Sequence, residues 1–246
     1  MADRAFQWIM CSWRPLTPNE LVEFVSVEPG DGFPEEIKIT FEYLLEVCNN
    51  WITISGDQST KYRRNNKEHC RFSHLSIQEY LEQVWSQEQA NTLVAKVCVG
   101  VILDNNYFKS GFVNDTRSQR ERRSGRSDIY FDGWFAHVSA ANDSDPNLSY
   151  LLTTFLGLPT QSSWQYRAWI DHLESRTHPK RESVCDIEGS GKRLARIETW
   201  QLQPKDSALR GVVYFKLDSV LQNWLGSTEM LRDYPELKTC ISGSRC

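Results

Sequence analysis

The spacing of apolar residues at the start of the chain predicts two short amphipathic helices. In residues 6–13, apolar side chains recur every three or four positions, as on one face of a helix: Phe6, Ile9, Met10 and Trp13. A capping box follows, with Thr17 as the N-cap, Pro18 in the first turn and Glu20 at the third helical position. We therefore expect a second helix to begin at Pro18.

The next pattern predicts a third helix and then a β-hairpin. Thr40 is a suitable N-cap, and apolar residues follow it at helical spacing: Phe41, Leu44, Leu45 and Cys48. The segments WITIS and CRFSHL are short and rich in β-branched or alternating residues, and the polar stretch GDQSTKYRRNNKEH separates them. Two such strands around a turn-rich tip are typical of a hairpin.

Ser76 with Glu79 forms a further capping box, which predicts that the helix after the hairpin is capped at Ser76. Its apolar residues again lie on one face: Ile77, Tyr80, Leu81, Val84 and Trp85. Three helices, a two-stranded wing and a closing helix predict a winged-helix domain over residues 1–85.

The rest of the chain is predicted to be helical. Ser86 with Gln89 caps a helix that has a broad apolar face, and residues 86–206 form an α-helical connector with disordered loops near 114–127 and 176–193. Residues 207–246 are predicted to form an incomplete helix pair and a tail. The expected fold class is therefore mainly α with one small β-hairpin.

Charge and cysteine content narrow the class of protein. The 246 residues carry a formal net charge of −4, so no overall field attracts nucleic acid or an anionic membrane. Seven cysteines, without a C-x-x-C pair, suit reduced thiols in the cytoplasm. The longest apolar run, Leu93 to Leu103, contains Lys96 and is too short to cross a bilayer. We expect a cytoplasmic protein without a membrane partner.

Several segments resemble one family. The stretch FSHLSIQEYL, Phe72 to Leu81, resembles the F-x-H-L-S-x-Q-E-[FY]-L signature in the winged-helix domain of NACHT-type signalling ATPases, the NOD-like receptor or STAND class. FQWIMCSWRPLTPNELVEFVSV is similar to the start of that domain in fungal NACHT–ankyrin receptors, a type sometimes labelled as a GPI inositol-deacylase winged helix. NLSYLLTTFLGLPTQSSWQYRAWIDHL is similar to their helical connector. SALRGVVYFKLDSVLQNWL resembles a degenerate ankyrin repeat.

The resemblance implies a non-enzymatic regulatory role beside an ATPase module. In the family that module precedes the winged helix and ankyrin repeats follow the connector, so both are the expected partners of this chain. The chain resembles a middle piece of a longer receptor, or the product of a gene split from its neighbours. The nearest approach to a P-loop, EGSGKR, has Asp186 where the first glycine should be and Arg193 in place of the magnesium-binding Ser or Thr. We therefore expect no cofactor in this chain, because ATP or ADP would be held by the missing module.

The same signature singles out His74. In the resembling receptors the histidine at this position reaches the β-phosphate of ADP in the neighbouring module and holds the inactive state closed. A strand-to-helix seam suits that task, because the helix N-terminus adds partial positive charge. The alternative is a half-buried structural histidine bonded to the backbone. The other signature residues are expected to support the fold: Phe72, Leu75, Ser76, Ile77, Glu79, Tyr80 and Leu81.

Metal binding and serine catalysis both find little support in the residues. Zinc binding by His69, Cys70 and His74 lacks a fourth ligand and a second cluster. A serine nucleophile would need a G-x-S-x-G elbow, which does not occur, so nothing supports deacylation.

Nucleic-acid binding is the alternative function, since many winged helices place a helix in the major groove. The recognition helix here would be FEYLLEVCNN, which offers Glu42 and Glu46 and no Lys or Arg. Acidic side chains repel phosphates, although the wing tip holds four basic residues between 61 and 67.

Overall fold

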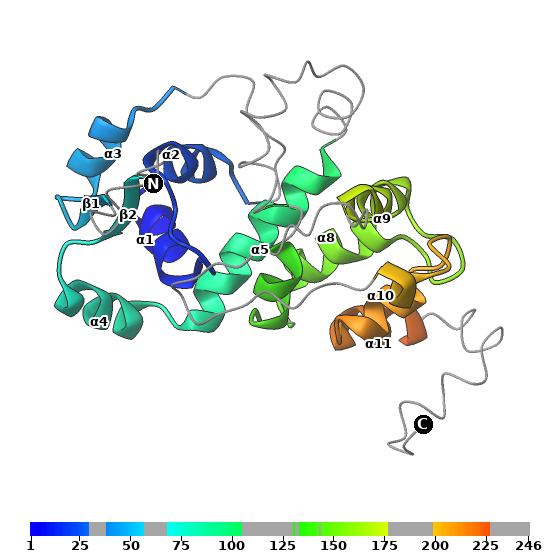
Figure 1. Ribbon diagram of the computed structural model, residues 1–246. Helices are drawn as coiled ribbons and strands as arrows, with labels where there is room; N and C mark the ends of the chain where they lie inside the picture. Colours follow the sequence, from blue (N-terminus) through cyan, green and yellow to red (C-terminus); the bar gives the residue numbers. More distant parts are fainter. Residues whose placement is uncertain are drawn as a thin grey trace. The chain divides into compact units, whose positions relative to one another are not determined.

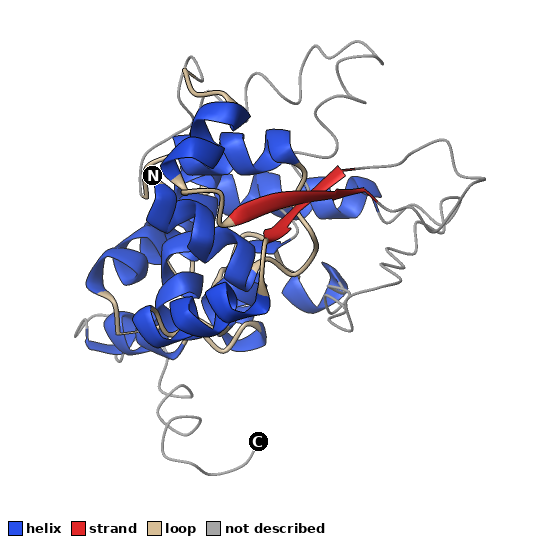
Figure 2. Ribbon diagram, turned by 90° about the vertical axis from the view of Figure 1, so that its left-hand side faces the viewer, coloured by secondary structure: helices blue, strands red, loops and turns tan. Residues whose placement is uncertain are grey.

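The computed structural model describes residues 1–29, 38–56, 68–104, 130, 133–142, 144–176 and 199–226. Most of these residues are helical, and the sheet found among them is a two-stranded antiparallel ribbon (Figures 1 and 2). The fold is therefore mainly α with a small β-hairpin, as predicted. The described residues fall into two compact units, of which the first ends at Leu151 and the second begins at Leu152.

The first unit begins with the element order predicted for a winged helix. Three helices precede the hairpin and two follow it: α1 (Ala2–Cys11), α2 (Pro18–Ser26), α3 (Phe41–Val47), β1 (Ile52–Gly56), β2 (Glu68–Phe72), α4 (Leu75–Val84) and α5 (Gln87–Leu103). The two strands pair in register from Ile52 with Phe72 to Gly56 with Glu68. On its other side, β2 contacts the link between α1 and α2, where the Cys70 N–H donates to the Leu16 carbonyl at 2.7 Å.

Side-chain caps fix where three of these helices begin, and all three were predicted. The box of Thr17 with Glu20 opens α2, with both hydrogen bonds present. The Thr40 hydroxyl accepts a backbone N–H of α3. The box of Ser86 with Gln89 opens α5. Each cap satisfies a backbone N–H that the helix leaves without an internal partner.

The cap of α4 differs from the prediction, which placed it at Ser76 with Glu79. The N-cap is His74, whose Nδ1 accepts the Ser76 backbone N–H at 3.1 Å, and the helix begins at Leu75. The backbone of His74 is extended, with φ −147° and ψ 149°, so its ring can fold back over the open end of the helix. Ser76 already has helical backbone and cannot cap the helix that contains it, so the predicted box was wrong.

Aromatic packing around α1 forms much of the core of the first unit. The rings of Trp8 and Phe24 stack with centroids 4.4 Å apart, and Phe6 stacks on Trp51 at 5.6 Å. Helix α5 packs against α1 and is buried on nearly all sides. The predicted stripe on α1 includes the buried Phe6 and Met10 but not Trp8, which is fully buried. Both faces of α1 are covered, so a one-sided pattern does not describe all of its contacts.

Four cysteines in the described part of the chain are buried: Cys11, Cys48, Cys70 and Cys98. Burial raises the pKa of the Cys48 thiol to about 11, and it raises the pKa of Cys98 well above its usual value. Desolvation disfavours the charged thiolate, so the Cys48 and Cys98 thiols are protonated at neutral pH and pack as small apolar groups.

The second unit is helical and aromatic. Helix α8 (Pro146–Leu156) contains the boundary between the two units. The elements after it belong to the second unit: α9 (Trp164–Arg176), η1 (Thr199–Leu202), α10 (Leu209–Tyr214) and α11 (Asp218–Gly226). Four aromatic rings contact one another in succession, Phe155 with Tyr166, Tyr166 with Trp169 and Trp169 with Phe215, at centroid distances of 5.8, 5.9 and 5.9 Å. A Cβ at Gly211 would clash with the Tyr166 hydroxyl, so a side chain where α10 meets α9 would force Tyr166 to shift.

Some predictions concern residues or properties that the structure does not describe. The predicted loops near 114–127 and 176–193 lie outside the described residues, apart from Arg176 at the end of α9, and so does the wing tip at 57–67. A helix pair is present where an incomplete repeat was expected, while its ankyrin character stays a prediction. The domain boundaries after residues 85 and 206 also stay predictions, and α5, which was assigned to the connector, packs on α1.

Two leucines at opposite ends of α4 provide a matched test of this packing. Leu81 is 2% exposed and Leu75 is 65% exposed. Leu81→Ala should lower the free energy of unfolding by about 2–5 kcal/mol, because it leaves a cavity in the core. Leu75→Ala should change it by less than about 0.5 kcal/mol, as at other surface positions. Urea unfolding of both variants measures the difference, and equal losses would contradict the packing of α4.

Candidate functional site

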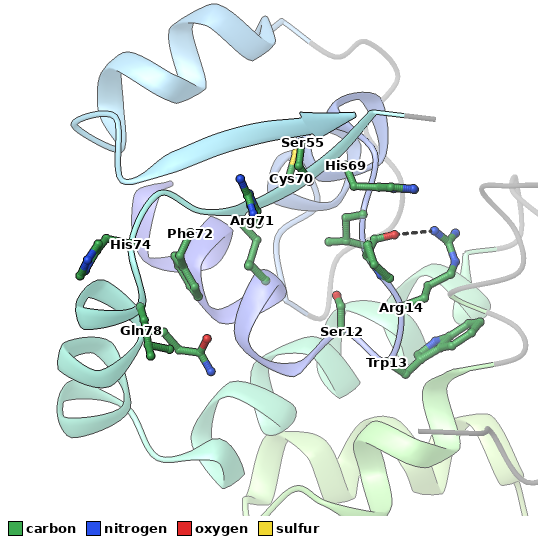
Figure 3. A pocket seen from close by; sticks show the side chains of 14 residues that line it. Ser12, Trp13, Arg14, Ser55, His69, Cys70, Arg71, Phe72, His74 and Gln78 are labelled. Atoms are coloured by element: carbon green, nitrogen blue, oxygen red, sulfur yellow. Dashed lines mark hydrogen bonds between the residues drawn. The ribbon is translucent and has the colours of Figure 1, made fainter. Parts of the chain in front are cut away.

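A pocket lies beside β2 in the first unit. It has a volume of about 610 Å³, within the usual range for ligand sites, and is formed by the α1–α2 link, β2 and the start of α4 (Figure 3). The lining residues come from these elements and their neighbours: Ile9, Ser12, Trp13, Arg14, Pro15, Leu16, Ser55, His69, Cys70, Arg71, Phe72, His74, Leu75 and Gln78. The hydrogen bond from Cys70 to Leu16 therefore joins two walls of this pocket.

The charged residues of the lining are all basic. It contains two arginines and two histidines and no Asp or Glu. Arg14 is compensated by Glu20 in a two-pronged ion pair, with Nη2 to Oε1 at 2.7 Å and Nη1 to Oε2 at 3.0 Å. Arg71 is exposed, and its side chain has no hydrogen-bond or ionic partner among the residues that the structure describes. Arg71 thus supplies the uncompensated positive charge of the pocket.

Glu20 connects the pocket wall to the start of α2. Burial by itself would raise the pKa of its carboxyl, but the hydrogen bonds and charge of Arg14, with two hydrogen bonds to Thr17, hold that pKa below its usual value. The carboxylate therefore fixes the Arg14 side chain and caps α2 at the same time. This double role holds the α1–α2 link in place beside β2.

His74 lies at the end of β2 that faces α4, and its ring is exposed. Its Nδ1 accepts the Ser76 backbone N–H and lies 2.7 Å from the Ser76 hydroxyl. An acceptor nitrogen carries no proton in the neutral ring, so the proton must be on Nε2. The cap therefore selects one tautomer and leaves the Nε2–H outside the cap.

His69 and Cys70 have different roles in the pocket. His69 is half-buried, and its Nδ1 is buried without a hydrogen-bond partner in the described parts of the chain. Burial, followed by the nearby charge of Glu20, raises the pKa of the Cys70 thiol to about 12. A thiol with such a pKa is protonated at neutral pH and does not act as a nucleophile. Among the described residues, no three His, Cys, Asp or Glu side chains gather as a metal site requires.

The structure brings together part of the predicted signature. Phe72, His74 and Leu75 all line the pocket. The remaining members lie elsewhere on α4: Ser76, Glu79 and Tyr80 are exposed, Ile77 is half-buried and Leu81 is in the core. The Tyr80 ring still contacts Trp51 at 5.9 Å.

Sequence reasoning missed Arg71 and Arg14. Strand alternation places Arg71 on the face of the hairpin opposite to the buried Cys70, so the exposure of Arg71 could be predicted from the sequence pattern. The position of Arg14 was not, because it depends on the long-range contact between Leu16 and Cys70. No local pattern in the sequence of the α1–α2 link predicts the hydrogen bond between Leu16 and Cys70.

Comparison of the chain with protein-family models, with curated proteins and with solved structures found no match. The resemblance to NACHT–ankyrin receptors therefore rests on the sequence segments that carry it.

The His74 cap yields a stability prediction. His74→Ala removes the acceptor of the Ser76 N–H, so the free energy of unfolding should fall by about 0.5–2 kcal/mol. His74→Asn retains a side-chain acceptor and should stay close to the wild type. Ser76→Ala keeps the backbone donor and should cost less than His74→Ala. Urea midpoints of the three variants give the ranking, and a larger loss for Ser76→Ala would restore the predicted capping box.

The ion pair of Glu20 yields a pH dependence. Because its folded pKa lies below the unfolded value, its stabilisation is present at neutral pH and is lost as pH falls through the folded pKa. Glu20→Gln should therefore lower the free energy of unfolding by about 1–3 kcal/mol at pH 7 and by much less at acidic pH. The exposed Glu79→Gln is the matched control and should show little effect throughout. A deficit of Glu20→Gln that persists unchanged at acidic pH would rule out the ionic origin.

Proposed function

We propose that the first unit is a winged-helix regulatory module of the NACHT–ankyrin receptor type, which senses the nucleotide state of an adjacent ATPase module. The observation that carries this proposal is His74, whose exposed ring has Nδ1 engaged by its own helix, so that Nε2–H takes no part in the cap. In this proposal the Nε2–H donates to a phosphate oxygen of ADP bound in that module. The resemblance of FSHLSIQEYL to the family signature supports the same role.

The contact would act as a switch because it exists in one state only. While ADP is bound, the hydrogen bond holds the winged helix against the ATPase module and the receptor stays closed. A ligand shifts such an equilibrium only through its different affinity for the two states. One hydrogen bond to a charged group contributes about 1.5–3 kcal/mol, enough to change the closed-to-open ratio roughly ten- to a hundredfold.

The proposed role is regulatory and not enzymatic. This chain has no P-loop, so nucleotide would be bound by the ATPase module and not by the residues described here. The partners of the proposal are that module and ankyrin repeats beyond α11, where the α10–α11 pair leaves Val213 61% exposed. No helix in the described ranges is long and apolar enough to cross a membrane, and we propose a cytoplasmic location.

Nucleic-acid binding is the weaker alternative. In a DNA-binding winged helix α3 would face phosphates, yet its exposed side chains include Glu42, Tyr43 and Glu46. The carboxylates would repel a phosphate backbone. The basic wing tip between residues 61 and 67 lies outside the described residues and adds no structural support.

The switch is tested in a longer protein that joins an ADP-binding NACHT module to this chain. His74→Asn preserves a cap acceptor but lacks the outer Nε2–H, so ADP retention should weaken roughly ten- to a hundredfold while the unfolding midpoint is retained. Ser76→Ala, in the same turn, is the matched control and should retain ADP as the wild type does. If His74→Asn leaves ADP release unchanged, His74 is only a helix cap.

A second control uses the chain by itself. Calorimetric titration with ADP or ATP, with and without Mg²⁺, should give no binding heat, because the chain has no backbone nest or P-loop lysine for the phosphates. Micromolar binding would show that the nucleotide site lies in this chain and would overturn the division of roles.

A further inference from the structure

Strand β2 has a main-chain edge that is only partly used. In an antiparallel pair, alternate residues direct their N–H and C=O groups to the partner strand and the others direct them away. The Ser73 N–H donates to Trp51 of the β1 side, whereas the Cys70 N–H donates to Leu16 on the opposite side. Phe72 has the same parity as Cys70, so its N–H also points away from β1.

The edge is open at Phe72. The α1–α2 link satisfies Cys70 through Leu16, but within the described chain Phe72 makes no main-chain hydrogen bond on that side. Phe72 lines the pocket together with Ser12 and Ile9, so free volume adjoins this part of the strand. An unpaired strand edge that faces a pocket is the arrangement that accepts an added strand.

The side chains of β2 define what such a strand should carry. Successive residues alternate between the two faces, with Arg71 on one and Phe72 on the other. Figure 3 shows His74, Arg71 and His69 spread along β2 rather than converging on one point. This elongated arrangement fits an extended chain better than a single small anion. Cross-strand neighbours on one face interact directly, so acidic residues fit beside Arg71 and apolar residues beside Phe72.

We propose that the pocket binds an extended segment of a partner protein, with alternating acidic and apolar residues, that adds to β2 at its free edge. The carboxylates pair with Arg71, which has no other ionic partner in the described residues. The apolar residues contact Phe72, Ile9 and Leu75, which line the same pocket. The inference stands apart from nucleotide sensing, because neither Arg71 nor the Phe72 edge requires an ATPase module.

Amide hydrogen exchange of the whole chain tests the edge pairing directly. The probe is an N-acetylated peptide of five residues in which Glu and Val alternate, and a peptide of alternating Lys and Val is its matched control. In the free protein the Phe72 amide should exchange quickly and the Cys70 amide slowly, since only Cys70 is bonded. The acidic peptide should slow exchange at Phe72 and leave Cys70 unchanged. Binding without protection of Phe72 would overturn the strand addition.

Substitutions of Arg71 test whether its positive charge binds the acidic peptide. Arg71→Ala should weaken binding of the acidic peptide about tenfold, and Arg71→Lys should recover part of the loss, because a positive charge is retained. Lys38→Ala removes an exposed positive charge outside the pocket and should have no effect. Equal affinities for Arg71→Ala and Lys38→Ala would remove Arg71 from the site.

Methylated peptides test which edge is used. An added strand pairs through one of its two edges, so methylation of the Glu nitrogens and methylation of the Val nitrogens should have opposite outcomes. One methylated peptide should keep its affinity and the other should lose binding. If both bind as the unmethylated peptide does, the main chain takes no part and the proposal fails.

Discussion

The hydrogen bond between the Cys70 N–H and the Leu16 carbonyl, at 2.7 Å, is the contact on which the pocket of the first unit depends. It ties the link between α1 and α2 to the hairpin, although the two segments are far apart in the chain. The Arg14–Glu20 ion pair then holds the link on its other side and connects it to the start of α2. With the link fixed, the pocket has two walls, and the edge of β2 is satisfied at Cys70 but open at Phe72.

Local rules predicted much of this fold because helix ends are local events. The boxes of Thr17 and Ser86 and the Thr40 cap involve residues three positions apart, and all three form as expected. The prediction failed at α4 for an equally local reason. Ser, Thr, Asn and Asp are the usual N-caps, so the pattern predicted Ser76 as the cap of α4. The imidazole of His74 is a less common acceptor, but His74 has the extended backbone that an N-cap needs.

The candidate site was predicted only in part, since its residues come from segments that meet through tertiary contacts. The signature located His74 and Phe72, but it was silent on the cap that fixes the tautomer of His74. Arg14 and Arg71 reach one pocket only after the link has docked on β2. The buried Trp8 shows the same limit in the core, because a single apolar stripe does not reveal a helix that is covered on two faces.

The rate at which the buried thiols react with an alkylating reagent would report local opening of the first unit. Alkylating reagents attack the thiolate, and burial keeps Cys48 and Cys70 protonated, with pKa values of about 11 and 12. Each thiol can therefore be labelled only when its surroundings open to solvent. Cys70 lies in the strand that joins the link, and Cys48 follows α3, so their labelling rates separate loosening of the pocket wall from fraying of α3. The native sequence provides both positions without an introduced probe.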